Sequence, residues 1–374
     1  MQASQIRRHL SVSRSGSVLL IAITALSALA LSVGGARARS DAPDPPAALR
    51  RRPDFTPAAI GAGSFAIISQ TVAYAAPFPI TDLRYPNRES FDIRRLTVFR
   101  PNGGASGNAR RPVIFFVHGG GWVDGYRDWY DWVADVFTGE KGWVTVVIDY
   151  RLTSDQVFLA DQYCPDRATC SLPQNIPLRT KAAEYPDNIE DVAAAYRWTL
   201  AHIGEYGGDP RQVFVFGHSA GAHLAALLAT AGDYADLRPH IRGVIAMSGV
   251  YRLTDAGFKL LYNYILTQTF GAPLEDAELS AASPAALIQP AGGYGAIQLL
   301  YCEGDLPLFP AQTTAMTNAL TANGIPYRLD YLPGYTHVSE MTAIQSANEL
   351  PTVRIIEFIE NLLHYGVWLP LVLR

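Results

Sequence analysis

Hydrophobic and polar positions alternate along this chain in two ways, one typical of buried strands and one typical of amphipathic helices. Short runs rich in Val, Ile and Phe have the continuous apolar character of strands that are buried on both faces. Longer segments between these runs carry apolar residues at helical spacing. The predicted strands are 67–75, 112–117, 143–148, 213–216, 241–247, 297–301 and 327–332, and the predicted helices are 128–137, 186–203, 220–230, 311–322 and 353–363.

The order of these elements predicts the fold class. Strands and helices follow one another in turn, which favours a mainly parallel sheet with helices on both faces. Two further segments, 152–184 and 252–290, interrupt the alternation. Insertions of this kind lie over the carboxyl edge of such a sheet, where ligands bind, so we interpret them as a lid. Apolar residues at helical spacing within 256–270 predict a cap helix in the second segment.

The N-terminal segment has the features of an export signal. Arginines precede an uncharged apolar run at 17–33, and a small-x-small cleavage site follows at 36–38. We therefore predict a signal peptide over 1–38 and a periplasmic or secreted protein. An uncleaved membrane anchor is the alternative, because seventeen residues are close to the length that spans a bilayer. A Pro- and Ala-rich linker and the first strand then occupy 39–75, and one domain of catalytic size occupies 76–374.

Composition and charge narrow the range of partners. The chain has 374 residues, is 49% hydrophobic and carries a net charge of −4. Without the four arginines of 1–38 the net charge would be −8, which argues against nucleic acid as the main partner. We expect contact with a membrane only if the N-terminal segment stays uncleaved. The oligomeric state does not follow from the sequence.

The three cysteines are too few for a disulfide framework, and no Cys/His cluster has the spacing of zinc ligands. We therefore expect no metal and no cofactor. Export would bring Cys164 and Cys170 into an oxidising compartment, where they could form one disulfide; two unpaired thiols are the alternative. Cys302 lies in an apolar run and is expected in the core.

A candidate nucleophile lies between a predicted buried strand and a predicted helix, in the sequence Gly-His-Ser-Ala-Gly at 217–221. A strand that turns sharply into a helix needs a strained backbone at the central residue. It also needs glycine on both sides, because a Cβ there would collide with the neighbouring turn. Ser219 is then held at the helix N-terminus. A second glycine motif, His-Gly-Gly-Gly-Trp at 118–122, follows an earlier strand, and its backbone N–H groups can approach a ligand oxygen.

A serine hydroxyl needs a base that removes its proton, and the base needs an acceptor that orients it. In folds with this turn, the acid and then the histidine follow the serine along the chain. His337 comes directly after a predicted strand, whereas His364 lies at the end of the last helix. Asp305, just past another strand, is the predicted acid. Its competitors are Glu303, Asp255, Asp330 and Asp276.

These motifs resemble those of α/β-hydrolase fold esterases and lipases with an HGGGW oxyanion motif. The likeness is closest to the hormone-sensitive-lipase-like and the feruloyl-esterase and kynurenine-formamidase-like groups. It covers about 90–365. The resemblance implies an α/β-hydrolase fold, with a mainly parallel central sheet, helices on both faces and a cap made of insertions. The other residues that carry it are Asp149 to Leu152, Tyr185, Pro186, Asp191, Ser283 and Pro284.

The same resemblance implies roles for particular residues. The oxyanion donors would be the N–H groups of Gly120, Gly121 and Ala220, while Asp149 and Arg151 would be structural. The expected function is that of a serine hydrolase that cleaves small-molecule carboxylic esters through a Ser219, His337 and Asp305 triad and an acyl-enzyme.

The substrate side of the site is less defined by the sequence. Trp122, Tyr251 and Phe309 belong to aromatic residues on or near loops that should border the site, which favours an aromatic or short apolar ester. An amide-cleaving relative, such as a formamidase or exopeptidase, would use the same catalytic residues. A catalytically inactive binding protein with a hydrolase fold is a further alternative.

Overall fold

The computed structural model describes residues 65–76, 79–80, 91–92, 94–103, 110–153, 183–290 and 292–365. The predicted export signal, most of the linker, Cys164, Cys170 and most of the 152–184 insertion lie outside these residues. Within the described part of the chain, no helix combines the length and the apolar character that crossing a membrane requires.

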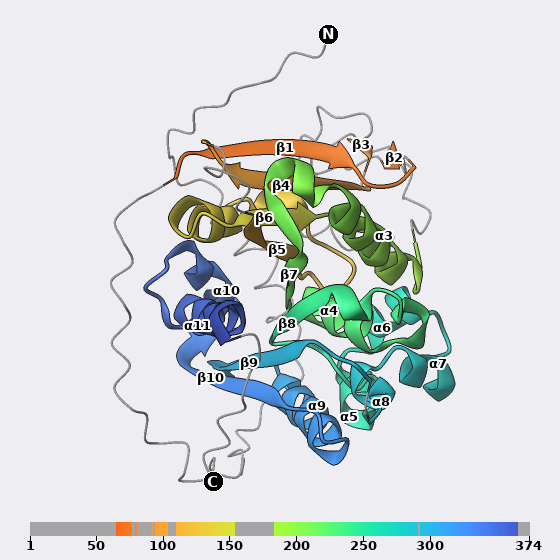
Figure 1. Ribbon diagram of the computed structural model, residues 1–374. Helices are drawn as coiled ribbons and strands as arrows, with labels where there is room; N and C mark the ends of the chain where they lie inside the picture. The colour runs from red at the N-terminus through yellow and green to blue at the C-terminus, as the bar shows by residue number, and fades with distance from the viewer. Residues whose placement is uncertain are drawn as a thin grey trace, which may run out of the picture.

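Eight strands form one twisted sheet in the order β1-β4-β6-β5-β7-β8-β9-β10 (Figure 1). The six strands β6, β5, β7, β8, β9 and β10, in their order in the sheet, are parallel to one another. The strand β4 is antiparallel to both of its neighbours, β1 and β6. A separate short pair joins β2 and β3. The strands are β1 (Ile67–Ala73), β2 (Pro79–Ile80), β3 (Phe91–Asp92), β4 (Arg95–Pro101), β5 (Arg111–Val117), β6 (Val144–Ile148), β7 (Gly208–His218), β8 (Ile241–Met247), β9 (Ala296–Gly304) and β10 (Tyr327–Thr336).

Helices cover both faces of this sheet, as the alternating pattern predicts. Figure 1 shows α3 and α4 on one side and α11 on the other. Each side has its own apolar core, because continuous apolar strands present side chains to both faces. The α-helices are α3 (Asp187–His202), α4 (Ala220–Thr230), α5 (Ala256–Leu261), α6 (Asn263–Phe270), α7 (Asp276–Ala281), α8 (Pro284–Leu287), α9 (Phe309–Ala322), α10 (Ser339–Thr342) and α11 (Leu350–Tyr365).

The segment predicted as a helix over 128–137 differs from that prediction. It forms a 3₁₀ turn, η2 (Arg127–Tyr130), and a π-helical turn, η3 (Asp135–Glu140). Asp149, just past β6, accepts hydrogen bonds from both the backbone N–H and the guanidinium of Arg127. The start of the segment is therefore held by a buried tertiary ion pair, and this contact overrides the local helical pattern.

The predicted cap helix over 256–270 is also interrupted. It divides into α5 and α6 at Tyr262, whose backbone leaves the helical region (φ −104°, ψ 18°). Asp255 begins the first piece, because its side chain accepts a hydrogen bond from Phe258 N at 2.9 Å. The predicted cap thus exists as two short helices instead of one.

Candidate active site

Ser219 lies at the sharp turn between β7 and α4. Its backbone has φ 57° and ψ −121°, a conformation that residues with a side chain rarely adopt. The flanking glycines make the turn possible. A Cβ on Gly217 would be 2.2 Å from the carbonyl oxygen of Gly221, and a Cβ on Gly221 would be 2.1 Å from that of Val117. The close packing that the sequence motif predicts is therefore present.

The glycine-rich segment after β5 is a loop with an unusual backbone. Gly120, Gly121 and Trp122 all have positive φ angles, of 117°, 61° and 62°. A Cβ on Gly120 would be 2.0 Å from the backbone oxygen of Asp124, so the loop folds back tightly on itself. His118 lies beneath the loop, fully buried, and its ring stacks on Tyr150 at a centroid distance of 4.4 Å.

Asp305 and His337 meet at the carboxyl ends of β9 and β10. The two atoms His337 Nδ1 and Asp305 Oδ1 are 2.7 Å apart, and both side chains are almost completely buried. A carboxylate only accepts, so the imidazole donates from Nδ1 and keeps Nε2 free to take a proton. Asp305 also accepts from Ser248 Oγ at 2.7 Å and from Leu306 N at 2.8 Å, which fixes its orientation.

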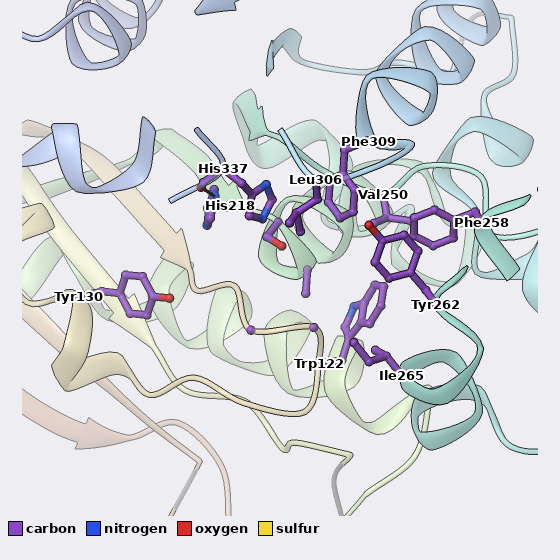
Figure 2. A pocket seen from close by; sticks show the side chains of 14 residues that line it. Trp122, Tyr130, His218, Val250, Phe258, Tyr262, Ile265, Leu306, Phe309 and His337 are labelled. Carbon is purple, nitrogen blue, oxygen red and sulfur yellow. Dashed lines mark hydrogen bonds between the residues drawn. The ribbon is translucent and has the colours of Figure 1, made fainter. Parts of the chain in front are cut away.

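One pocket brings these segments together. Ser219, His337, Gly120, Gly121 and Ala220 all line it, together with apolar side chains of the cap and of α9. Figure 2 shows the imidazoles of His337 and His218 on one side, and the apolar side chains gathered on the other. Those apolar residues are Trp122, Val250, Phe258, Tyr262, Ile265, Leu306 and Phe309.

Buried polar residues behind His337 were not identified in the sequence. His218 Nε2 donates to the carbonyl oxygen of His337 at 2.9 Å. Burial lowers the pKa of His218 well below its usual value, and the neighbouring His337 lowers it further. Glu340 Oε1 lies 3.5 Å from the same nitrogen, and burial raises the pKa of Glu340 well above its usual value. Burial thus disfavours the charged form of both side chains, which lie behind the loop that carries His337.

A glutamate three residues after a candidate histidine is the only sequence signal that could have identified Glu340. His218, Glu340 and His337 are also the residue types that bind transition metals, and one ligand atom from each lies within 4.8 Å of the others. Both imidazoles, however, already make hydrogen bonds that suit a neutral base and its support. We assign the cluster to orienting His337.

The other acids considered from the sequence have separate partners. Glu303 accepts from Gly334 N at 2.8 Å, Asp255 begins α5, and Asp276 pairs with Lys259 on the surface. Asp330 is buried but pairs with Arg328. His364 is exposed near the end of α11. Among the described residues that line the pocket, none of these five is present.

The three aromatic residues predicted to bind substrate fall into two groups. Trp122 and Phe309 line the pocket. Tyr251 does not: its side chain is fully buried, its backbone N–H donates to Gln312 Oε1 at 2.9 Å, and its ring packs under Gly249. Tyr251 therefore belongs to the core, and its prediction as a substrate-binding residue is wrong for the described pocket.

Asp149 and Arg151 are in buried ion pairs, as the resemblance implies. Asp149 binds Arg127. Arg151 contacts Asp191 through its Nε at 2.8 Å and Asp187 through a terminal nitrogen at 2.7 Å. The Arg151 pairs join the turn after β6 to α3, whereas the Asp149 pair joins the same turn to η2.

The described strands and helices have the arrangement of the α/β-hydrolase fold. A family model described as the alpha/beta hydrolase fold matches residues 181–341. Esterase B from Lactobacillus rhamnosis has a similar solved structure, with a TM-score of 0.58 and 15% sequence identity, covering 94% of this chain and 96% of that one. Est2, a thermophilic esterase from the planctomycete Thermogutta terrifontis, has a TM-score of 0.54 and 21% identity, covering 74% and 90%.

Sequence relatives carry the comparison beyond the fold. The probable carboxylic ester hydrolase LipM of Mycobacterium tuberculosis is 30% identical over 265 residues, which are 65% of this chain and 54% of LipM. The versiconal hemiacetal acetate esterase of Dothistroma septosporum is 25% identical over 279 residues, which are 69% of this chain and 73% of that enzyme. This chain spans about half the length of LipM. The fold that the motifs resemble is confirmed: the chain has the α/β-hydrolase fold, and its sequence is similar to those of proteins named as ester hydrolases.

Proposed function

We propose that this protein hydrolyses carboxylic esters, with Ser219 as nucleophile, His337 as general base and acid, and Asp305 as the group that orients His337. The observation that carries the proposal is the 2.7 Å hydrogen bond between Asp305 and His337 beside a pocket that Ser219 also lines. A strained serine, an oriented imidazole and a glycine loop at one pocket are the parts that acyl transfer requires. The named ester hydrolases among its relatives support the same reaction.

The reaction proceeds in two halves. His337 Nε2 takes the hydroxyl proton as Ser219 Oγ bonds to the ester carbon, and the carbonyl electron pair moves onto oxygen. The N–H groups of Gly120, Gly121 and Ala220 stabilise that oxyanion. When the intermediate collapses, the ester C–O bond breaks and His337 protonates the departing alcohol. Water then attacks the acyl-enzyme by the same route, releasing the carboxylic acid and restoring Ser219.

The pocket favours an uncharged ester with a short or aromatic acyl group. Its empty volume is about 580 Å³, part of which opens to solvent at the mouth. Among the described lining residues there is no Lys, Arg, Asp or Glu, so no side chain is available to pair with a charged substrate group. The aromatic rings of Trp122, Phe258, Tyr262 and Phe309 instead offer flat apolar contact surfaces.

The test is a panel of p-nitrophenyl esters of increasing acyl length, measured with the wild type and with Ser219→Ala. We expect the wild type to prefer short acyl groups. We expect Ser219→Ala to lower kcat by about 10⁴-fold or more and to unfold at the same temperature, because only the nucleophile is lost. Near-normal turnover by Ser219→Ala would reject the assignment, and a matched anilide tests whether amides are cleaved as well.

We also propose, from the sequence features of 1–38, that the protein is exported. The N-terminal sequence of mature protein recovered from a producing cell tests this. A first residue near 39 is expected, whereas an intact apolar segment in a detergent-soluble fraction would support an anchored esterase instead.

A further inference from the structure

Trp122 has a backbone conformation that is unfavourable for a residue with a side chain. Its φ of 62° lies in the left-handed region, which residues other than glycine rarely adopt, so surrounding contacts must hold it there. Its carbonyl oxygen accepts hydrogen bonds from the backbone N–H of Thr153 at 3.0 Å and from its Oγ1 at 3.2 Å. Its ring is buried and meets Phe270 edge-on at 5.8 Å.

Trp122 also contacts His223. The indole Nε1 lies 3.2 Å from His223 Nδ1, and the two rings meet edge-on at a centroid distance of 5.1 Å. An indole N–H can only donate, so Nδ1 must accept and the proton must be on Nε2. His223 Nε2 in turn lies 2.8 Å from the carbonyl oxygen of Ala282, which can only accept. The two hydrogen bonds thus require one neutral tautomer.

The environment of His223 keeps that neutral form. The side chain is fully buried, and burial lowers the pKa of His223 to about 4. Protonation would turn Nδ1 into a donor facing the indole donor, and the contact would be lost. At neutral pH, therefore, the link between Trp122 and His223 is intact.

His223 also belongs to the helix that begins at the nucleophile. It lies one turn after Ser219 on α4, and its backbone N–H donates to the carbonyl oxygen of Ser219 at 3.1 Å. Trp122 directly follows the glycines of the oxyanion loop. The hydrogen bond between the two side chains therefore joins the two backbones that would supply the oxyanion donors, Gly120 and Gly121 from the loop and Ala220 from α4.

We propose that His223 is a positioning residue that holds the oxyanion loop at its working distance from Ser219 by accepting a hydrogen bond from Trp122. This inference rests on the proposed ester hydrolysis and adds to it a residue that touches neither substrate nor the reacting atoms. A displacement of about 1 Å in such a loop can lower turnover by about 100-fold. The contact therefore acts on kcat and leaves binding of the ester largely unchanged.

Two substitutions at position 223 separate this role from plain core packing. In His223→Asn, Oδ1 takes the position of Nδ1 and still accepts from Trp122, while the donor to Ala282 is lost. In His223→Gln, the longer side chain reaches the position of Nε2 and Ala282 but leaves the indole without its acceptor. Both variants bury one amide of similar size, so each is the matched control for the other.

The expected result is a loss of kcat of about 10- to 100-fold in His223→Gln, with KM within about threefold of wild type. His223→Asn should recover most of the wild-type kcat. Active sites are counted by titration with an organophosphonate, so that kcat refers to folded enzyme. Trp122→Phe should lose about as much as His223→Gln, and the double variant should lose no more than either, because both remove the same contact.

Equal kcat values for His223→Gln and wild type, with only a lower unfolding temperature, would overturn the proposal, as would a loss in His223→Asn as large as that in His223→Gln. A readout independent of activity distinguishes this failure from failure of the proposed function. The indole N–H of Trp122 should exchange slowly with solvent in wild type and His223→Asn, and faster in His223→Gln. If Ser219→Ala kept its turnover while this exchange pattern held, the proposed function would fail and the structural link would stand.

Discussion

The pocket has two sides that are built in different ways. One side, the floor, consists of the strand ends that carry 118–122, 217–221, Asp305 and His337. The other side, the cap, consists of α5 and α6 over 256–270. Floor residues are buried and held by backbone geometry and hydrogen bonds between distant strands. The cap has exposed apolar side chains, Leu260 at 83% and Tyr264 at 45%, and joins the floor through side chains.

A hydrogen bond from Tyr262 to the floor shows how the cap is attached. The Tyr262 hydroxyl donates to the carbonyl oxygen of Pro307 at 2.8 Å, two residues past Asp305. The ring of Tyr262 also packs on Phe258 and Phe309, at centroid distances of 4.5 and 5.9 Å. We infer that the floor determines the chemistry and the cap determines which acyl group fits, so that changes in the two should have separable effects.

The largest expected effect comes from the acid of the floor. Asp305→Asn should lower kcat by about 10³- to 10⁴-fold, because an amide no longer selects the tautomer of His337 in which Nε2 accepts a proton. Steady-state kinetics with a short p-nitrophenyl ester measure this. Glu303→Gln is the matched control on the same strand end. The side chain of Glu303 accepts a hydrogen bond from Gly334 N and does not line the pocket. The kcat of Glu303→Gln should therefore stay within about twofold of wild type. Reversed results would move the acid to Glu303.

The glycine loop gives the next largest effect, with a control one residue away. In Gly120→Ala the new Cβ would lie 2.0 Å from the backbone oxygen of Asp124, so the loop must move, and we expect kcat to fall by about 100-fold or more. In Gly121→Ala the nearest atom is Cγ2 of Ile265 at 3.6 Å, and the positive φ alone costs roughly 1–2 kcal/mol. Similar losses in both variants would show that strain, not the collision, limits this loop.

The floor and the helix α4 that continues from it contain buried histidines, whereas the cap contains none, so the floor side should be the acid-sensitive one. Unfolded His223 has an ordinary pKa near 6.5, whereas in the folded protein its pKa is about 4. Between these values the unfolded state binds more protons, so the free energy of unfolding falls as the pH falls through this range. The loss should approach about 3 kcal/mol at pH 4. His218 acts in the same direction, because its pKa is also lowered.

Denaturant unfolding at several pH values tests this prediction. His223→Asn is the useful comparison, because it removes the titrating group while keeping the acceptor for Trp122. Its free energy of unfolding should depend less on pH between 4 and 6.5 than that of the wild type. An unchanged slope would mean that His223 contributes little to acid sensitivity.

Much of the floor could be predicted from the sequence, because its chemistry depends on tight backbone turns that only certain residue types can form. Only glycine fits at 217 and 221, and the order of serine, acid and histidine along the chain limits the candidates to few. Strands that are buried on both faces are equally easy to recognise in a sequence, because they appear as continuous apolar runs. The predicted helix 220–230 matches α4, and the predicted strand 241–247 matches β8.

The parts that could not be predicted depend on contacts between distant segments. Nothing near His218, His223 or Glu340 in the sequence indicates their buried partners. Those of His218 and His223 come from the turn after β10, the loop at 118–122 and the turn after α7, and that of Glu340 is His218 at the end of β7. The strand β4 was not identified either, since charged residues flank and end it. Tyr251 was expected at the pocket because a loop position gives no sign of which way its ring packs.

The smallest expected effect belongs to the cap and would show whether it acts separately from the floor. Tyr262→Phe removes only the hydroxyl that donates to Pro307, a net contribution of about 1 kcal/mol. We expect a change of a few-fold in KM and a relative gain for longer acyl chains, because the cap is less firmly held over the pocket. Tyr264→Phe, two residues away and outside the described pocket lining, is the control and should leave the ratio of long to short substrates unchanged. If Tyr262→Phe instead lowered kcat equally for every acyl length, the cap would be part of the catalytic geometry, and the separation between the two sides would not hold.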